Sequence, residues 1–134
     1  MNIDDLLKKY QVEFEKDIKI DQINLRDIQM RLPALKHKWI ARLINNKQKI
    51  NELGKLKYVT KQEAFDKLKD EGAIGLSHIA LEKKIEQFDD IKNINNKVKD
   101  LKLVVEYLEK IEQIMKTVTY DVSNLIKIME LEEL

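Results

Sequence analysis

The sequence has no cysteine, one proline and three glycines among its 134 residues. The lack of cysteine excludes disulfides and every metal site that is built on thiolates. Because proline and glycine mark tight turns, their scarcity argues against a sheet with many short strands. The wealth of Lys, Glu, Leu and Ile instead favours long helices. We therefore expect an all-α protein.

Long apolar runs are missing as well. No stretch approaches the roughly 18 apolar residues that identify a membrane-spanning helix. The N-terminal residues MNIDDLLKKY contain no apolar signal-peptide core. With 43% hydrophobic residues the chain is nevertheless too apolar to be disordered. The sequence predicts a soluble, cytoplasmic protein without a membrane partner.

No pattern of catalytic residues is present in the sequence. His37 and His78 are the only histidines, and neither stands in a metal-binding spacing. The acid pairs Asp4-Asp5 and Asp89-Asp90 could serve general acid–base catalysis. Both pairs lie at expected helix starts, however, where acids complement the helix dipole. The residues GAIG lack the lysine of a phosphate-binding loop. We predict no enzyme, no cofactor and no metal site.

The helical spacing of apolar residues predicts one domain over residues 1–134 with four segments. These segments are an N-terminal helix in 1–20, a long basic helix in 21–70, a turn and short helix in 71–90, and a long heptad-patterned helix in 91–134. Asp21 and Ser77 are the expected N-caps of the second and third helices. Pro33 either kinks the second helix or marks a fresh start. The two long helices should fold back as an antiparallel hairpin, with the short helices as accessories.

The last segment carries an apolar stripe in which residues recur every three or four positions. A hairpin is only two helices thick, so it cannot bury this stripe and the remaining apolar residues together. Burial of each such side chain contributes about 1.5–3 kcal/mol. We therefore predict a homo-oligomer held by this stripe. Its residues are Ile91, Ile94, Val98, Leu101, Val105, Leu108, Ile111, Met115, Val118, Val122 and Leu125.

Positive charge is concentrated between Arg31 and Lys61. This basic tract holds nine basic residues and one acid, Glu52, which gives a net charge of +8 in a chain of net charge +1. The first thirty residues carry five bases and seven acids, and the residues from Gln62 onward carry eleven bases and sixteen acids. A concentrated tract of this kind favours an anionic partner.

Aromatic residues lie in or beside the basic tract, at Trp39, Tyr58 and Phe65. Lysines that follow phosphates and rings that stack on bases bind single-stranded nucleic acid without reading its sequence. Trp39 shares the apolar stripe of its helix, so we expect it in the core, whereas Tyr58 suits stacking and core packing equally. The predicted DNA-binding residues are Arg42, Lys47, Lys49, Lys55, Lys57, Tyr58 and Lys61. The alternative is a coiled-coil scaffold whose basic stripe pairs with acidic helices of neighbouring copies.

Several stretches resemble one known family. They are IDDLLKKY, KDIKIDQINL, Pro33-Ala34-Leu35, Lys38-Trp39 and the closing NNKVKDLKLVVEYLEKIEQIMKTVTYDVSNLIKIME. In these the chain resembles the UvsY-like recombination mediators of T-even-like phages. It departs from them at KQEAFDKLKDEG, where Gln62, Glu63 and Ala64 replace basic positions. The departure shifts the expected DNA contacts upstream, to the stretch from Lys47 to Lys61.

The resemblance implies a non-enzymatic phage protein that acts in the cytoplasm of the bacterial host. It implies a ring-like homo-oligomer, a hexamer or heptamer, that binds single-stranded DNA. Its further partners would be a RecA-like recombinase and the single-stranded-DNA-binding protein that coats the strand. The mediator would help the recombinase assemble on such coated strands.

Overall fold

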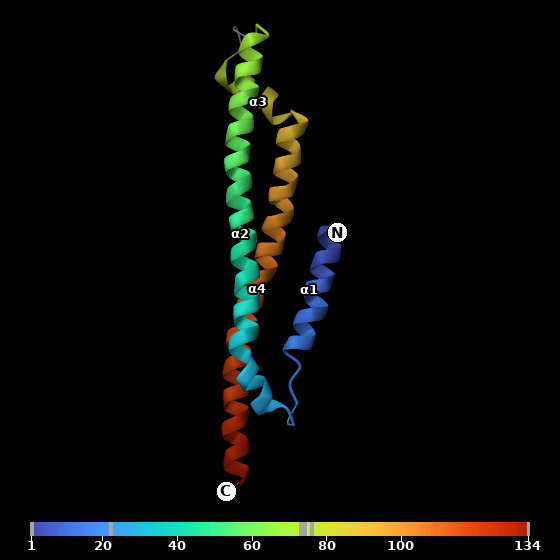
Figure 1. Cartoon of the computed structure of the whole chain (residues 1–134), viewed down its shortest axis with the longest axis vertical. Helices are drawn as coiled ribbons and strands as arrows, with labels where there is room; N and C mark the ends of the chain where they lie inside the picture. Colours follow the sequence, from blue (N-terminus) through green and yellow to red (C-terminus); the bar gives the residue numbers. More distant parts are fainter. Residues whose placement is uncertain (1, 22, 73–74, 76, 134) are drawn as a thin grey trace. The chain divides into compact units, whose positions relative to one another are not determined.

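The computed structural model describes residues 2–21, 23–72, 75 and 77–133. In these residues the chain forms four helices, α1 (Ile3–Asp17), α2 (Leu25–Asp70), α3 (His78–Glu86) and α4 (Asp89–Glu133) (Figure 1). The predicted all-α class is confirmed. Among the same residues, none of the helices is long and apolar enough to cross a bilayer.

The helix starts follow local hydrogen bonding. Ser77 caps α3, as predicted, because its hydroxyl accepts the backbone N–H of Ala80 at 3.2 Å. The prediction that Asp21 caps α2 was wrong. Its carboxylate accepts the backbone N–H groups of Ile23 and Asn24, both at 2.9 Å, and so closes a turn ahead of the helix. Such a local turn competes with helix formation, so α2 begins only after it.

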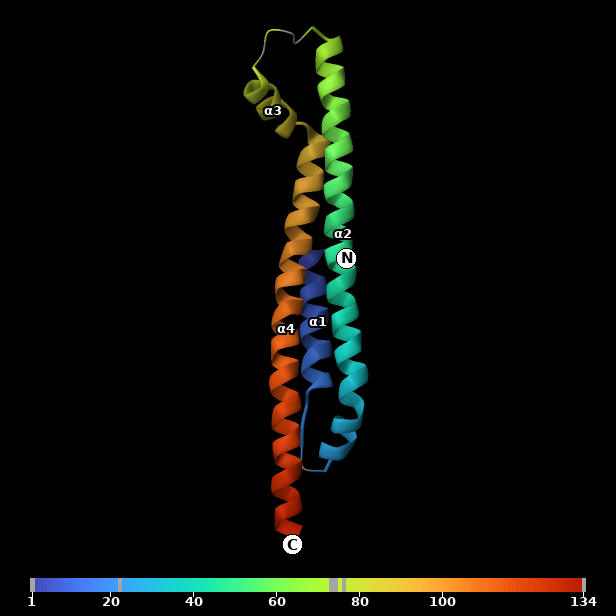
Figure 2. The same cartoon turned by 90° about the vertical axis from the view of Figure 1, so that its left-hand side faces the viewer.

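Pro33 lies inside α2, which continues through it without a break. The first turns of α2 lean away from the axis of the later turns (Figure 2). A proline inside a helix removes one backbone hydrogen bond and pushes the preceding turn aside, which produces a bend of this kind. Of the two alternatives that the sequence left open at Pro33, the structure shows the kink.

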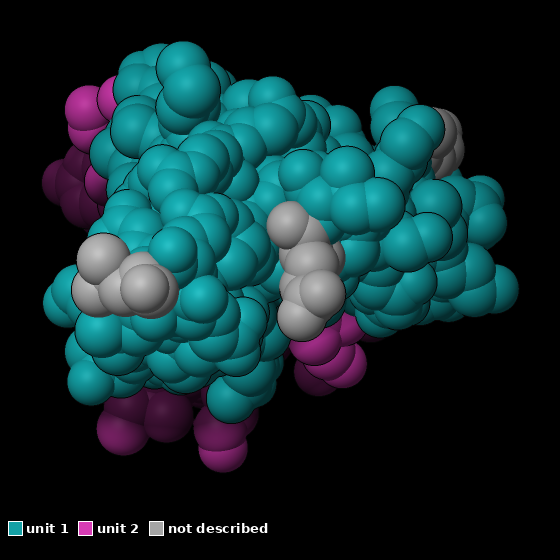
Figure 3. All heavy atoms as spheres, turned by 90° about the horizontal axis from the view of Figure 1, so that it is seen from below, with its two compact units in different colours: residues 1–45, 104–134 teal, residues 46–103 magenta. Residues whose placement is uncertain are grey.

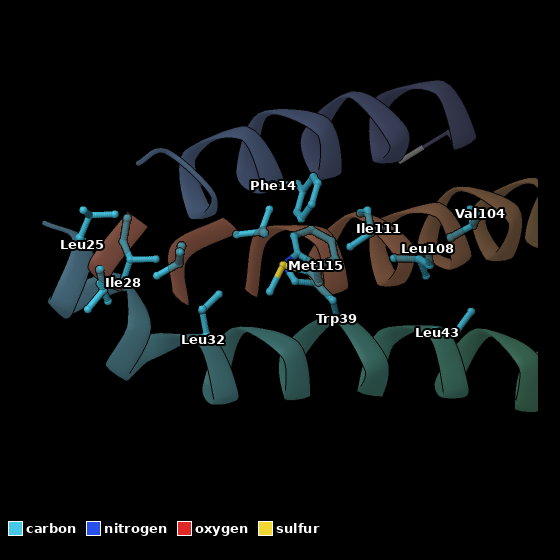
Figure 4. Close-up of a cluster of buried hydrophobic side chains, with 13 residues drawn as sticks. Phe14, Leu25, Ile28, Leu32, Trp39, Leu43, Val104, Leu108, Ile111 and Met115 are labelled. Carbon is cyan, nitrogen blue, oxygen red and sulfur yellow. The ribbon is translucent and has the colours of Figure 1, made fainter. Parts of the chain in front are cut away.

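The chain divides into two compact units, residues 1–45 with 104–134 (unit 1) and residues 46–103 (unit 2), which Figure 3 colours separately. In unit 1 the helix α1 packs with the first part of α2 and the last part of α4. Figure 4 shows side chains from all three helices pointing into one core. The buried residues of this core are Phe14, Leu25, Ile28, Leu32, Trp39, Leu43, Val104, Leu108, Ile111, Met115, Val118, Val122 and Ile126.

Unit 2 has a smaller core, in which α3 packs with the parts of α2 and α4 that belong to this unit. Ile85 of α3 and Ile91 of α4 are fully buried there, beside Ala64 and Leu68 of α2. The chain turns at Gly72, whose φ of +86° lies in the left-handed region that glycine adopts without strain. Asn46, at the start of the unit's share of α2, is a buried polar residue with 7% of its surface exposed.

Most of the apolar stripe predicted to join copies is buried inside the chain itself. The stripe residues that are buried are Ile91, Ile94, Leu108, Ile111, Met115, Val118 and Val122. Val98, Leu101 and Val105 are half-buried, and Leu125 is 42% exposed. At two places the buried residue is the neighbour of the predicted one: Val104 is buried in place of Val105, and Ile126 in place of Leu125. The sequence-based hairpin left α1 out of this packing, although α1 supplies the third side of the core in unit 1. That the stripe also joins copies stays a prediction.

Two isoleucines three residues apart on α4 allow a matched test of this core. Ile111 is 1% exposed and Ile114 is 44% exposed. We expect Ile111→Ala to lower the free energy of unfolding by about 2–5 kcal/mol, because it removes buried methylenes and leaves a cavity. Ile114→Ala, the control, should change it by less than about 1 kcal/mol. Chemical denaturation followed by circular dichroism measures both, and equal losses would contradict this assignment of the core.

Candidate nucleic-acid interface

Trp39 is buried, with 2% of its surface exposed. Its indole N–H donates to Oδ2 of Asp17 at 3.0 Å. The rings of Tyr10 and Phe14 meet it edge to face, each with centroids 5.6 Å away. All three partners belong to α1. The prediction that Trp39 lies in the core is therefore confirmed, and its ring is not available for stacking on bases.

The basic residues beside Trp39 also face α1. Arg42 forms an ion pair with both carboxylate oxygens of Glu13, and its guanidinium lies over the rings of Trp39 and Tyr10 at 4.6 and 4.9 Å. Lys38 forms ion pairs with Asp17 and, at 3.6 Å, with Glu13. These cations fasten α1 to α2. Arg42, which the sequence assigned to DNA binding, thus carries its charge in a contact inside unit 1.

The electrostatics of Glu13 reflect this contact. The hydrogen bond from Arg42, with smaller contributions from the charges of Arg42 and Lys38, lowers the pKa of Glu13 below its ordinary value, although burial acts in the opposite direction. The same pair raises the pKa of Arg42. The ionised form of the pair is thus the form that the fold favours.

Two lysines of the tract converge on one carboxylate in unit 2. Lys61 Nζ lies 2.6 Å from Oε1 of Glu86, and Lys57 Nζ lies 3.8 Å from the same oxygen. The other oxygen, Oε2, accepts a hydrogen bond from Nδ2 of Asn95 at 3.2 Å. The hydrogen bond from Lys61 lowers the pKa of Glu86. Both lysines were assigned to DNA binding from the sequence, and both are engaged by α3.

Four other residues of α2 form an exposed face in unit 2. Lys47, Asn51, Lys55 and Tyr58 follow one another at steps of four, four and three residues, so they lie on one side of the helix. All four are exposed, Tyr58 to 67%. We call these residues the exposed lysine face. Lys49 is also exposed, but it stands two residues from Lys47 and so points to another side of the helix.

The aromatic residues divide in the same way. The sequence left two roles open for Tyr58, stacking and core packing. Its exposure excludes core packing, because the ring is open to solvent. Phe65 packs against the core of unit 2, and its ring stacks on the imidazole of His78 with centroids 5.7 Å apart. Of Trp39, Tyr58 and Phe65, Tyr58 is therefore the residue whose ring is exposed.

The acid pairs occupy helix starts, where acids complement the helix dipole, as the sequence indicated. Asp4 and Asp5 lie in the first turn of α1, and Asp89 and Asp90 in the first turn of α4. Over the described ranges, no three histidine or acidic side chains come together in a way that could hold a metal ion.

The family model described as the recombination, repair and ssDNA binding protein UvsY matches residues 13–133. The chain belongs to the UvsY family. Membership makes it a recombination, repair and single-stranded-DNA-binding protein, and the resemblance drawn from the sequence is confirmed.

The fold has relatives among solved structures. Two crystal structures of the bacteriophage T4 recombination mediator protein UvsY, in lattice types IV and II, match with a TM-score of 0.78 and 15% sequence identity. The match covers 98% of this chain and 99% of the first structure, and 100% and 99% in the second case. At this identity the likeness shows a shared fold. Comparison with curated protein sequences gives no match.

Sequence reasoning missed the acids that hold the basic tract. Glu13, Asp17 and Glu86 lie outside the tract, in α1 and α3. A signal for two of them was present, because Glu13 and Asp17 are four residues apart and therefore share one side of α1. They flank Phe14, the buried residue of that helix.

The Glu13–Arg42 pair predicts a dependence of stability on pH. The pKa of Glu13 is lower in the folded chain than in the unfolded chain, so its contribution is present above the unfolded pKa and is lost as pH falls through the folded pKa. We expect Glu13→Gln to destabilise the chain at neutral pH, and its difference from the wild type to shrink as the pH falls through the acidic range in which Glu13 becomes protonated. Melting temperatures over this pH range measure the effect. Glu63→Gln, at an exposed position, is the control, and a difference that stays constant with pH would exclude a role for the charge of Glu13.

Proposed function

We propose that this chain is a non-enzymatic recombination mediator. It binds single-stranded DNA along α2 and promotes the loading of a RecA-like recombinase onto strands coated by a single-stranded-DNA-binding protein. The observation that carries the proposal is the exposed lysine face, in a chain whose family is described as binding single-stranded DNA. Bacteriophage T4 UvsY, whose fold the chain shares, is called a recombination mediator protein.

The binding mode follows from the chemistry of this face. Lys47 and Lys55 stand eight residues apart, about 12 Å along a helix that rises about 1.5 Å per residue. Their ammonium groups can bind two phosphates of the same strand, and the ring of Tyr58 gives a base a surface on which to stack. Neither kind of contact reads base identity. A mediator needs this property, because it acts wherever a coated strand is found.

Binding by one copy is modest in this proposal. Arg42, Lys57 and Lys61 share their charge with acids of the same chain and are partly buried, so the more exposed Lys47, Lys49 and Lys55 would supply the main phosphate contacts. Several copies joined in a ring would bind one strand together, because each bound copy raises the effective concentration of the next contact. Weak contacts also release the strand readily, which lets the recombinase replace the mediator.

A ring requires a surface between copies. Leu125, Ile128 and Leu131 leave 42%, 52% and 68% of their surface exposed near the end of α4. Exposed apolar residues that are grouped on one element mark an interaction surface. We place the contact between copies here, at the exposed end of the predicted stripe. A hexamer or heptamer remains the expected assembly.

Loss of the two lysines of the exposed face should weaken DNA binding. We expect Lys47→Ala with Lys55→Ala to reduce the affinity for labelled single-stranded DNA while the chain stays folded, as its circular dichroism would show. The slope of log affinity against log salt concentration should fall by about 0.7 for each lost phosphate contact. Fluorescence anisotropy at several salt concentrations measures both quantities. The rate at which the recombinase assembles on a coated strand should fall in this variant as its affinity for DNA falls.

The matched control removes the same charge from α4 of unit 2, as Lys97→Ala with Lys99→Ala, both at exposed positions. This variant should keep the wild-type affinity and salt slope. If the two double variants bind equally well, the exposed lysine face does not contact DNA. The coiled-coil scaffold would then explain the basic tract better.

A charge at the end of α4 should separate the copies. We expect Ile128→Glu to convert the oligomer into monomers, because a charge enclosed in an apolar contact pays a large desolvation penalty. Helix content should stay the same, since Ile128 is exposed within the chain. Sedimentation at micromolar concentration measures the particle mass. Val12→Glu on α1, at a position that is 67% exposed, is the control. A wild-type monomer would exclude the ring.

A further inference from the structure

Glu86 is held by three nitrogen atoms from two long helices. The ammonium groups of Lys57 and Lys61 approach Oε1, at 3.8 and 2.6 Å, and the amide of Asn95 donates to Oε2 at 3.2 Å. Two cations therefore share one anion. The cluster keeps one unit of positive charge after Glu86 is counted.

This arrangement has the chemistry of a phosphate site. A phosphodiester group has one negative charge and two oxygens free to accept hydrogen bonds, as the carboxylate of Glu86 has. Lysine ammonium groups and neutral amide donors both bind phosphate oxygens in protein–nucleic acid contacts. The cluster of Lys57, Lys61 and Asn95 can thus receive a phosphate in the place where it now holds a carboxylate.

Solvent reaches the carboxylate and both cations. The side chain of Glu86 is 40% exposed, and those of Lys57 and Lys61 are 31% and 28% exposed. Ion pairs exposed to this degree contribute little to stability, so an incoming anion can displace one at small cost. The helix α3 need not move, because the neighbouring Ile85 stays fully buried in the core of unit 2 while the Glu86 side chain turns outward.

The cluster also adjoins the exposed lysine face. Lys61 is three residues from Tyr58 on α2, and Lys57 directly precedes Tyr58 in the chain. Residues three apart on a helix are neighbours on its surface. A strand that stacks one base on Tyr58 would bring its next phosphate to Lys61.

We propose that Lys57, Lys61 and Asn95 form a masked phosphate site for single-stranded DNA, which Glu86 occupies until the strand displaces it. The inference rests on the proposed function and deepens it, because it adds a site that the free protein keeps closed. Glu86 thereby weakens binding to other anions, and the site opens once the strand is already held at Lys47, Lys55 and Tyr58.

The test replaces Glu86 by its neutral counterpart. Glu86→Gln should bind labelled single-stranded DNA more tightly than the wild type. The salt slope should steepen by about 0.7, the value for one further phosphate contact of a single strand. Glu82→Gln is the matched control, because it removes the same charge from an exposed position on the same helix. An equal gain in both variants would show a general charge effect and overturn the masked site.

A second pair of variants identifies the cations. Replacing Lys57 and Lys61 by Ala should remove the gain in DNA affinity that Glu86→Gln produces. The same double replacement should weaken DNA binding by a larger factor in the Glu86→Gln background than in the wild-type background. Equal factors in the two backgrounds would overturn the proposal. Melting temperatures show that each variant is folded. If the wild type binds DNA and Glu86→Gln leaves affinity and slope unchanged, only the masked site fails. If neither protein binds, the proposed function fails as well.

Discussion

The hydrogen bond from the indole of Trp39 to Asp17 decides how unit 1 is built. A buried indole N–H without an acceptor costs free energy, so Trp39 can enter the core only where a partner reaches it. Asp17 supplies that partner from the last turn of α1, which fixes where α1 lies along α2. The short N-terminal helix thereby covers the apolar surface that the two long helices leave open. Without it, a pair of helices would expose much of the core that Figure 4 shows.

The same contact explains why so much positive charge surrounds a tryptophan. The carboxylates that reach into this region attract Lys38 and Arg42, and Arg42 lies over the aromatic rings as well. In the first part of the tract the cations hold the fold together. Further along α2, in unit 2, Lys49 and Lys55 are exposed on the surface of the helix. The structure thus divides one run of lysine and arginine into cations that are engaged inside the fold and lysines that are exposed on its surface.

Much of the fold could be predicted because it rests on local patterns. Ile28, Leu32, Trp39 and Leu43 recur at helical spacing in the sequence, and the same residues line the core. Ser77 could be recognised as a cap because the capping bond spans only three residues. The failures involve partners far apart in the chain. The residues near Arg42 in the sequence do not predict its contact with Glu13, which lies 29 residues away. Those near Lys61 do not predict its contact with Glu86. A lysine looks the same in a sequence whether water or a carboxylate faces it.

Asn46 has a consequence for the alignment of the long helices. Repeating apolar layers fit almost as well after a slip of one helical turn, so a uniform stripe fixes the register only weakly. A polar side chain within the stripe removes this freedom, because a slip would carry its amide away from the partners that satisfy it. Asn46 is buried and satisfied where it stands. One turn is about 5.4 Å, enough to separate a lysine of α2 from a carboxylate that it touches. A buried amide in the stripe thus favours one register of α2, and with it the place that Lys57 and Lys61 take in unit 2.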